Sequence, residues 1–431
     1  SYDSNNDSSF MQTAISSVYW QDAEVNDNFS RVVDSVNQTI EQDKIYSLTN
    51  TLIGVNSDFS SDIVLFEKLH KLGYGFDFSE NDGSRTRQTK NLSTGSTETV
   101  KDTPDTKTIR ARFYLQDQFS FGDFDFIAGL GFDYYSLDAD NGLIYNPNQE
   151  DYILASDQSY KVLSPKFTVS YRPTDDSSVY ARYSQGFRPP AWYELSSSFA
   201  NPSFGYITLS NPDLKPERSH DFEIGYKTSG DNYATTFASY YNRYSDFMDA
   251  FAETGSYTLP GDTRELNAFQ TQNVSSAEIY GVEFTGIYYF SSQQDGFYIG
   301  NVFAWSEGNN LTDGLPLETI IPVTNRLSLG YQGLNDRWLV SVGMVYTGRP
   351  RLSNDYQEAQ PYYIPSSSLV FDLEAYWKIS DSVSLNASIN NLTNEAYFNY
   401  QDVRGLDNSN GDILRFSQPG RNFQVGAKFT F

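Results

Sequence analysis

The sequence predicts an all-β fold, a transmembrane antiparallel β-barrel, and three observations lead to it. Segments that alternate polar and apolar residues recur from one end of the chain to the other. The connections between these segments are alternately short and long. No apolar run approaches the roughly 20 residues that a membrane helix needs, so any crossing of a membrane must be made by strands.

The alternation is clearest at the end of the chain, over residues 421–431. As a strand, this stretch places Phe423, Val425 and Phe429 on one face and Gln424 and Lys428 on the other. A half-buried strand of a soluble sandwich would show the same pattern, so eleven residues alone do not decide between the two folds. The same alternation occurs at residues 108–116, 123–135, 368–377 and 382–390.

The lengths of the connections decide between a soluble sandwich and a membrane barrel. Short ones, rich in Gly, Asp and Ser, lie at 121–124, 173–177, 228–232, 291–296, 334–336 and 380–382. Long polar ones lie at roughly 80–106, 138–159, 187–215, 248–272, 309–322, 350–365 and 391–418. A transmembrane barrel keeps every second loop long because short turns face the periplasm and long loops face the outside. This spacing predicts about sixteen strands in one continuous antiparallel sheet without an internal domain, the first near residues 11–21 and the last ending at Phe431.

The facing of side chains follows from the alternation. We expect the apolar positions to contact lipid and the residues between them to face the lumen. The expected lipid-facing residues are Phe126, Leu130, Leu373, Val383, Leu385, Val425 and Phe429, and the expected inward residues are Asp372, Glu374, Asn386 and Lys428.

Composition excludes several classes of protein. The 431 residues include no cysteine, which rules out disulfides and thiolate metal sites and suits a cell-envelope compartment. The 55 acidic and 30 basic residues give a net charge of −25, which disfavours nucleic acid as a partner. With two histidines and no nucleophile–base spacing, the chain offers little for acid–base catalysis, so we do not expect an enzyme.

Three stretches carry more specific motifs, at residues 180–227, 272–286 and 390–431. Together they resemble the C-terminal barrel of TonB-dependent outer-membrane receptors, most closely the haem, haemoglobin and transferrin receptor branch. The run 187–190 resembles that branch's FRAP box, with Pro189 where the box has Ala, and the run 211–214 resembles its NPNL/NPDL box. Residues 402–406, followed by 418–421, are similar to the branch's ending.

The resemblance implies a domain organisation. Residues 1–431 would be the C-terminal part of a receptor barrel of about 22 strands, with the N-terminal plug domain and the first strands not in this sequence, as in a fragment or a truncated product. A closed porin of sixteen strands is the structural alternative, because that number also closes a channel.

The resemblance also implies a function. Such receptors lie in the outer membrane of Gram-negative bacteria and take up an iron-bearing ligand with energy that TonB delivers through the plug region. The ligand would be haem or haemoglobin, and the alternatives are a ferric siderophore receptor, a passive porin and a surface-binding barrel. The expected partners are outer-membrane lipid, TonB through the plug region, and an iron carrier such as haemoglobin. No intrinsic cofactor is expected, and haem would be a transported ligand.

The two boxes bracket the candidate ligand loop. Receptors of this branch often carry a haem-ligating His between the boxes, and this chain has none there. Residues 191–210 offer aromatics instead, and a Tyr can ligate ferric haem, although such residues can equally pack the loop while the prolines fix its path. The candidate residues are Phe187, Arg188, Pro189, Pro190, Trp192, Tyr193, Tyr206, Asn211, Pro212, Asp213 and Leu214, and Phe199 and Phe204 are the remaining aromatics.

Other polar residues lead to weaker expectations. His220 is in phase with Phe222 and should point outward at the outer rim, and His70 is in phase with Leu72 and should lie at the opposite interface. The acidic stretches 138–151 and 407–412 do not have EF-hand spacing, so solvated loops are expected there and no metal site is assigned.

Overall fold

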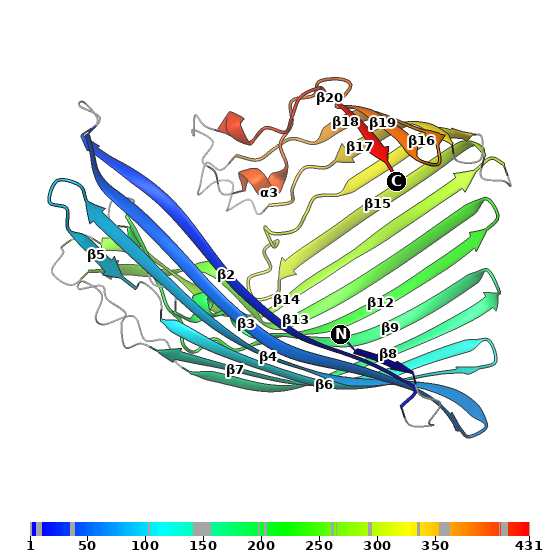
Figure 1. Cartoon of the computed structure of the whole chain (residues 1–431), viewed down its shortest axis with the longest axis horizontal. Coiled ribbons are helices and arrows are strands. Elements are labelled where there is room, and N and C mark those ends of the chain that lie inside the picture. Colours follow the sequence, from blue (N-terminus) through cyan, green and yellow to red (C-terminus); the bar gives the residue numbers. More distant parts are fainter. Residues whose placement is uncertain are drawn as a thin grey trace.

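The computed structural model describes residues 2–5, 11–34, 39–101, 104–140, 157–196, 199–201, 205–259, 263, 265–291, 295–333, 337–352, 363–404, 406 and 413–430. Within these ranges the chain forms one continuous β-sheet with short helical segments in its loops (Figure 1). No helix in the described part of the chain is long and apolar enough to cross a membrane.

Long antiparallel strands form the wall and pair with one another in chain order. They are β2 (Thr13–Asp34), β3 (Thr39–Leu65), β4 (Lys68–Asn91), β6 (Asp105–Phe121), β7 (Phe124–Asp140), β8 (Gln158–Thr174), β9 (Ser177–Arg188), β12 (Glu217–Gly230), β13 (Tyr233–Thr258), β14 (Glu265–Tyr289), β15 (Gly296–Asn310), β16 (Thr324–Gly333), β17 (Trp338–Thr347), β18 (Ser368–Ser380), β19 (Val383–Asn390) and β20 (Asn422–Phe429). These sixteen strands agree with the predicted number of about sixteen. Their pairing agrees with the predicted antiparallel sheet of the transmembrane type.

The sheet curves into most of a barrel (Figure 1). Among the described residues, β20 pairs with β19 alone, and β2 pairs with β3 and with the short strand β1 (Tyr2–Asn5), so the two ends of the sheet do not meet. The described wall is therefore not the closed sixteen-strand porin considered as the alternative.

Short elements occupy the loops. They are β5 (Thr97–Val100), α1 (Trp192–Ser196), β10 (Phe199–Asn201), β11 (Tyr206–Leu209), α3 (Tyr400–Val403) and η1 (Ile413–Phe416). β11 runs parallel to β14, so the expectation of exclusively antiparallel neighbours is wrong at this place. A parallel pair needs a long crossover, and the chain between β11 and β14 includes the β12–β13 hairpin, which supplies one.

Several strands continue far beyond a membrane. β3, β13 and β14 have 27, 26 and 25 residues, whereas about 9–11 residues cross a bilayer. Two expected loops are therefore largely strand: β4 continues to Asn91, and residues 248–258 and 265–272 pair in the β13–β14 hairpin. Outside the bilayer both faces of a strand meet water, so the alternation that reveals a strand is lost.

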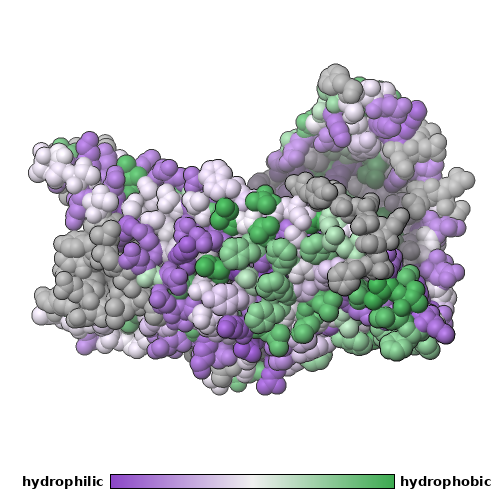
Figure 2. All heavy atoms as spheres, turned by 60° about the horizontal axis from the view of Figure 1, so that its bottom comes forward, coloured by the Kyte–Doolittle hydropathy of each residue, from purple (hydrophilic) through white to green (hydrophobic). Residues whose placement is uncertain are grey.

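The register agrees with the predicted facing. Leu130 lies opposite Leu115, Leu385 opposite Trp377, and Phe429 opposite Val383, all on one face. Glu374 lies on the other face, where its Oε1 accepts a hydrogen bond from Nη2 of Arg326, two strands away, at 3.0 Å. On the face of the molecule shown in Figure 2, hydrophobic residues gather across the middle, and hydrophilic residues predominate toward the left end.

Tyrosines on the inner face lie against glycines of the neighbouring strand. In each pair the two residues are direct register partners, and a Cβ added to the glycine would overlap the tyrosine side chain. The pairs are Tyr19–Gly54, Tyr180–Gly225, Tyr240–Gly281 and Tyr298–Gly330. Each large ring thus fills the space that the missing side chain leaves in the wall.

Candidate functional site

The two boxes of the candidate loop meet at the outer rim. β9 ends at Arg188 and β12 begins at Glu217, and these two residues are direct partners in the antiparallel register. The loop from Phe187 to Leu214 therefore leaves the wall and returns to it at adjacent positions. The strand pairing fixes the spacing of the two boxes.

A pair of carboxylates holds the Arg188 guanidinium. Its Nε donates to Oε2 of Glu217 at 2.6 Å and its Nη2 donates to Oε1 of Glu217 at 3.0 Å. Its Nη1 lies 3.0 Å from both carboxylate oxygens of Glu194 in α1. The hydrogen bonds to Glu217 and then to Glu194 raise the pKa of Arg188 further above its usual range, so the guanidinium stays charged at any physiological pH. Each of the three guanidinium nitrogens already donates to a carboxylate.

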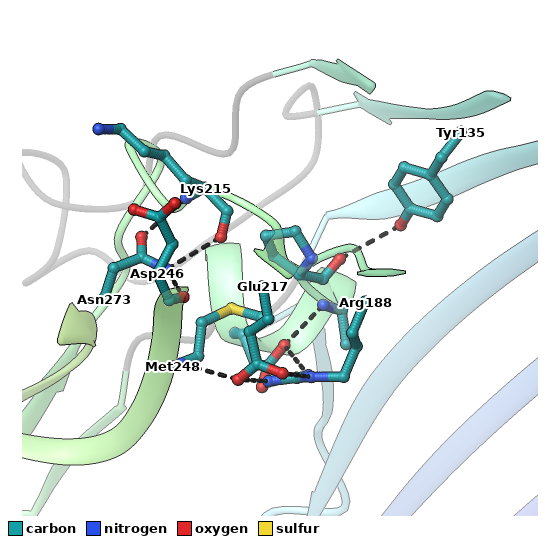
Figure 3. Close-up of polar contacts among 10 residues, drawn as sticks. Tyr135, Arg188, Lys215, Glu217, Asp246, Met248 and Asn273 are labelled. Atoms are coloured by element: carbon teal, nitrogen blue, oxygen red, sulfur yellow. Dashed lines mark hydrogen bonds and ion pairs between the residues drawn. The ribbon is translucent and has the colours of Figure 1, made fainter. Parts of the chain in front are cut away.

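The same carboxylates also bind backbone amides. Glu217, which is only 8% exposed, accepts a hydrogen bond from the backbone N–H of Met248 on β13 at 2.7 Å. Glu194 accepts one from the backbone N–H of Ala191 at 2.7 Å. Figure 3 shows these contacts converging on the Arg188–Glu217 pair. One network of charges, in which both carboxylates are largely buried and Arg188 is partly exposed, therefore ties β9, α1, β12 and β13 together.

The described part of the loop packs on the inner face of the wall. Tyr135 lies on the inner face of β7, and its hydroxyl donates to the carbonyl oxygen of Pro190 at 3.3 Å (Figure 3). Around this contact lies an apolar cluster in which the loop supplies Leu195, Leu214 and Trp192 and the wall supplies Tyr135, Leu137, Tyr160 and Met248. Trp192 therefore packs the loop, as the plainer interpretation of the aromatics expects.

The second box is held by the side chain of Asn211 and by the carbonyl oxygen of Pro212. The amide nitrogen Nδ2 of Asn211 donates to the carbonyl oxygen of Thr271 at 2.8 Å, and its Oδ1 accepts from the backbone N–H of Asp213 at 3.1 Å. The carbonyl oxygen of Pro212 accepts from Nε2 of Gln158 at 2.8 Å. Asn211 thus shapes the turn, and Asp213 remains exposed.

Asn273 on β14 fastens the chain just after this box. Its Oδ1 accepts from the backbone N–H of Lys215 at 2.8 Å. Its Nδ2 donates to the carbonyl oxygens of Lys215 at 2.9 Å and of Asp246 at 2.6 Å (Figure 3). Together with the Arg188–Glu217 pair, these bonds fix both ends of the loop.

The structure brings most of the candidate residues together. Trp192 and Leu214 belong to the apolar cluster, and the carbonyl oxygen of the fully buried Pro190 accepts a hydrogen bond from Tyr135 of the same cluster. Arg188 is exposed and bound to Glu217 and Glu194, and Phe187 and Pro189 are half-buried. Tyr206 lies apart, half-buried at the start of β11 and opposite Asn267 of β14. The side chains of Tyr193 and Phe199, and all of Phe204, lie outside the described residues.

Sequence reasoning missed the partners of this loop. Glu194 and Glu217 hold Arg188, Asn273 holds Lys215, and Tyr135 and Tyr160 provide the wall against which the loop packs. Glu217 had a usable signal, because it follows the second box within three residues and β9 and β12 are neighbours. The other partners lie on distant strands and have no local signal.

The histidines lie on the outward face, as their phase predicts. Nδ1 of His220 is 2.9 Å from the hydroxyl of Tyr183. His70 is 8% exposed near the opposite rim, with its Nδ1 2.8 Å from Oδ2 of Asp117 and its ring stacked on Phe119. Among the described residues, no group of three or more His, Asp or Glu side chains could hold a metal ion. Most of the acidic stretch 138–151 and all of 407–412 lie outside those residues.

The C-terminal motif folds on itself. Nε2 of Gln418 donates to Oδ2 of Asp402 at 2.9 Å, and Nδ2 of Asn391 donates to the carbonyl oxygen of Pro419 at 3.2 Å. Val403 is fully buried. The described contacts of this motif join segments of the last loop before β20.

Comparison with known families identifies the fold. The model of the family described as TonB dependent receptor-like, beta-barrel matches residues 1–392. The chain belongs to this TonB-dependent receptor family. The family consists of receptors and transporters, not enzymes, and it is located in the Gram-negative outer membrane.

Two relatives of this receptor chain are proteins named for haemoglobin binding or for haemoglobin-haptoglobin utilization. The probable hemoglobin and hemoglobin-haptoglobin-binding protein 4 of Haemophilus influenzae is 26% identical over 323 residues, which cover 67% of this chain and 32% of that protein. The hemoglobin-haptoglobin utilization protein B of Neisseria meningitidis is 29% identical over 311 residues, which cover 64% of this chain and 38% of that protein. The chain thus spans about a third of the length of these relatives.

Solved TonB-dependent transporters share the fold. The copper transporter OprC superposes with a TM-score of 0.77 at 18% identity, covering all of this chain and 64% of OprC. The FrpB iron transporter from Neisseria meningitidis superposes with a TM-score of 0.69 at 16% identity, covering all of this chain and 62% of FrpB. At these identities the likeness concerns the fold alone.

Proposed function

We propose that this chain is the barrel part of an outer-membrane receptor that takes up an iron-bearing ligand, haem or haemoglobin, with energy supplied by TonB through a plug region. The observation that carries the proposal is the loop from Phe187 to Leu214, fixed at both ends and packed on the inner face at the outer rim. Relatives named for haemoglobin binding support this choice of ligand.

The role of Arg188 bears on how the ligand is held. The Arg188 guanidinium is bound by the carboxylates of Glu217 and Glu194, so its charge is already compensated and attracts a haem propionate only weakly. Arg188 therefore acts as a positioning residue that holds the loop. Lys215 and Arg218 are exposed nearby and are the cations that an incoming anion would meet.

The charge of the chain favours a protein ligand over free haem. A net charge of −25 repels a dianionic small molecule approaching from bulk solvent. Because Arg188 is neutralised by its own carboxylates, it does little to offset this field. A carrier protein that covers the propionates is repelled less, so we expect the receptor to prefer haemoglobin over free haem.

Uptake by cells that carry the intact gene tests the proposal. Deletion of residues 191–210 should abolish capture of haemoglobin and haem, whereas deletion of residues 141–150, from the segment that connects β7 with β8, should leave capture close to wild type. Equal capture by the two deletion strains would contradict the assigned site. Uptake of ferric siderophores alone would contradict the choice of haem or haemoglobin, and unchanged uptake without TonB would support a passive channel.

A further inference from the structure

The outer halves of β2, β3 and β4 form an extension of the wall. These strands have 22, 27 and 24 residues, and in Figure 1 their outer ends lie at the left, with the β2–β3 hairpin at the upper left. A membrane crossing uses about 9–11 residues of each, so roughly half of each strand lies outside the bilayer. Side chains on this extension are free to meet large solutes.

One face of the extension carries apolar and aromatic side chains together with arginines. The register aligns Val25 with Leu48 and Arg85 in one row across the three strands, and Asp27 with Tyr46 and Arg87 in the next. Phe29 follows in the third row, with its ring 5.6 Å from that of Tyr46 in a T-shaped contact. We call these seven residues the mouth patch: Val25, Asp27, Phe29, Tyr46, Leu48, Arg85 and Arg87.

The apolar members of the mouth patch are exposed. Val25 is 55% exposed, Phe29 is 57% exposed and Leu48 is 40% exposed. These side chains lie on the same face of the sheet as inward residues closer to the membrane on the same strands, such as Tyr19 on β2 and Asp58 on β3. The mouth patch therefore lies on the same face as the lumen wall and the packed loop, above the opening of the barrel and out of contact with lipid.

The arginines of the mouth patch are available for a partner. Within the ranges that the structure describes, neither Arg85 nor Arg87 has a carboxylate within 4.0 Å. Asp27, the acidic member of the patch, lies two strands away from Arg87. The two guanidiniums extend from alternate positions of one strand and present neighbouring positive charges on a strongly acidic chain.

The opposite face of the extension has the opposite charge. Asp82 of β4 lines a hollow there together with Asp138 and Asp140 of the nearby strand β7, and Lys107 is held by Glu80 with its Nζ 2.6 Å from Oε1. A partner bearing carboxylates is thus repelled from the outward face and attracted to the mouth patch. This contrast fixes the side from which such a partner approaches.

We propose that the mouth patch docks the protein part of the iron carrier, through a surface on which carboxylates surround an apolar centre. The proposal rests on the proposed function and extends it by separating the docking surface from the loop that meets the haem. Aromatic side chains and arginine are the residues enriched in the centres of protein interfaces and among those that contribute most to affinity. The area involved is an open strand face, which suits a folded protein rather than a small molecule.

The experiment measures binding of haemoglobin, haem-free globin and haemin to cells that display the intact receptor. The test variant is Arg85→Glu with Arg87→Glu, and a second variant, Val25→Ser with Phe29→Ser, removes apolar surface without changing charge. The matched control is Lys90→Glu, which reverses a charge on the outward face of the same strand. Surface biotinylation normalises each strain for the amount of receptor.

We expect the double arginine variant to weaken haemoglobin binding by about tenfold or more, mainly through slower association, and to lose most of the dependence on salt concentration. Haem-free globin should compete for the wild-type receptor, and haemin binding should be unchanged in all variants. Wild-type capture of haemoglobin that neither patch variant reduces overturns the docking surface and leaves the proposed function standing. A wild-type receptor that captures no haemoglobin overturns the proposed function and the docking surface together.

Discussion

Glu217 accepts two hydrogen bonds from the guanidinium of Arg188 and a third from the backbone N–H of Met248. The three donors come from two different strands, and the carboxylate that receives them is almost fully buried. A single buried side chain therefore joins the start of the candidate loop to β13.

Replacing Glu217 by Gln should release this loop. The amide has one acceptor oxygen where the carboxylate has two, and its NH₂ group faces donors, so the Arg188–Glu194 end of the network loses its anchor. We expect local opening to become easier by about 2–4 kcal/mol, seen as faster hydrogen exchange at the backbone amides of Leu195 and Met248. The control is Glu223→Gln on the same face of β12, where the carboxylate accepts a bond from the hydroxyl of Tyr180 at 2.6 Å. Unchanged exchange in the Glu217 variant would mean that the apolar cluster alone holds the loop.

The tyrosine–glycine pairs of the inner face give a second prediction. Gly225→Ala places a methyl group inside the ring of Tyr180, and we expect it to lower the free energy of unfolding by about 1–3 kcal/mol. Gly73→Ala on β4 is the matched control, because an added Cβ there meets nothing within 4 Å. The measurement is denaturant unfolding in detergent. Combining Gly225→Ala with Tyr180→Ser should cost less than the sum of the single changes, and strict additivity would show that the ring does not occupy that space.

The orientation of side chains toward lipid or toward the lumen gives a third prediction, at two adjacent positions of β19. Leu385 lies opposite Trp377 and Ala427 on the outward face, and Asn386 points to the lumen. Leu385→Arg should destabilise the protein by about 2–4 kcal/mol if it lies near the bilayer midplane, and Asn386→Arg should cost much less. Unfolding from lipid vesicles measures the loss of stability in both variants. Equal losses at the two positions would contradict the assignment of Leu385 to lipid and of Asn386 to the lumen.

The sequence predicted the part of the wall that lies in the membrane better than the part outside it. Where one face meets lipid, as at residues 368–377 and 382–390, alternation is strong and the strands match. Residues 80–91 also pair in regular register, and residues 248–258 pair with two register shifts, yet both faces of these segments meet water, so their sequences predicted loops. The physical reason is that alternation reports the contrast between two environments and not the hydrogen bonding of the strand.

The candidate site was predictable only in outline. The two boxes marked the loop, and their prolines and Asn211 shape it as local motifs can. The partners of Arg188 and the cluster around Tyr135 depend on which strands are neighbours and on a loop that folds inward. No local sequence pattern predicts the strand neighbours or the direction in which the loop folds. The mouth patch was missed for a related reason, since its residues are spread over three strands and meet only through the register.

The β3–β4 turn shows the same limit and gives the last prediction. Leu65 pairs with Lys68, so Phe66 and Glu67 form a two-residue hairpin loop, and both have left-handed backbone conformations with φ of 48° and 61°. Asn-Gly is the sequence that such a turn favours, and Phe-Glu carries no such signal, which is why the turn was not predicted.

A left-handed conformation costs about 1–2 kcal/mol for an ordinary residue, so Glu67→Gly should raise the free energy of unfolding by about 1 kcal/mol. Phe66→Asn should also stabilise the protein in detergent, because Phe66 is 94% exposed and has little packing to lose, but its gain should be smaller in lipid vesicles, where an aromatic side chain at the interface contacts headgroups. The opposite change, Gly122→Ala in the β6–β7 turn, where φ is 60°, should destabilise the protein by a similar amount and serves as the control. Loss of stability on Glu67→Gly would show that the Glu67 side chain contributes more than its backbone strain costs.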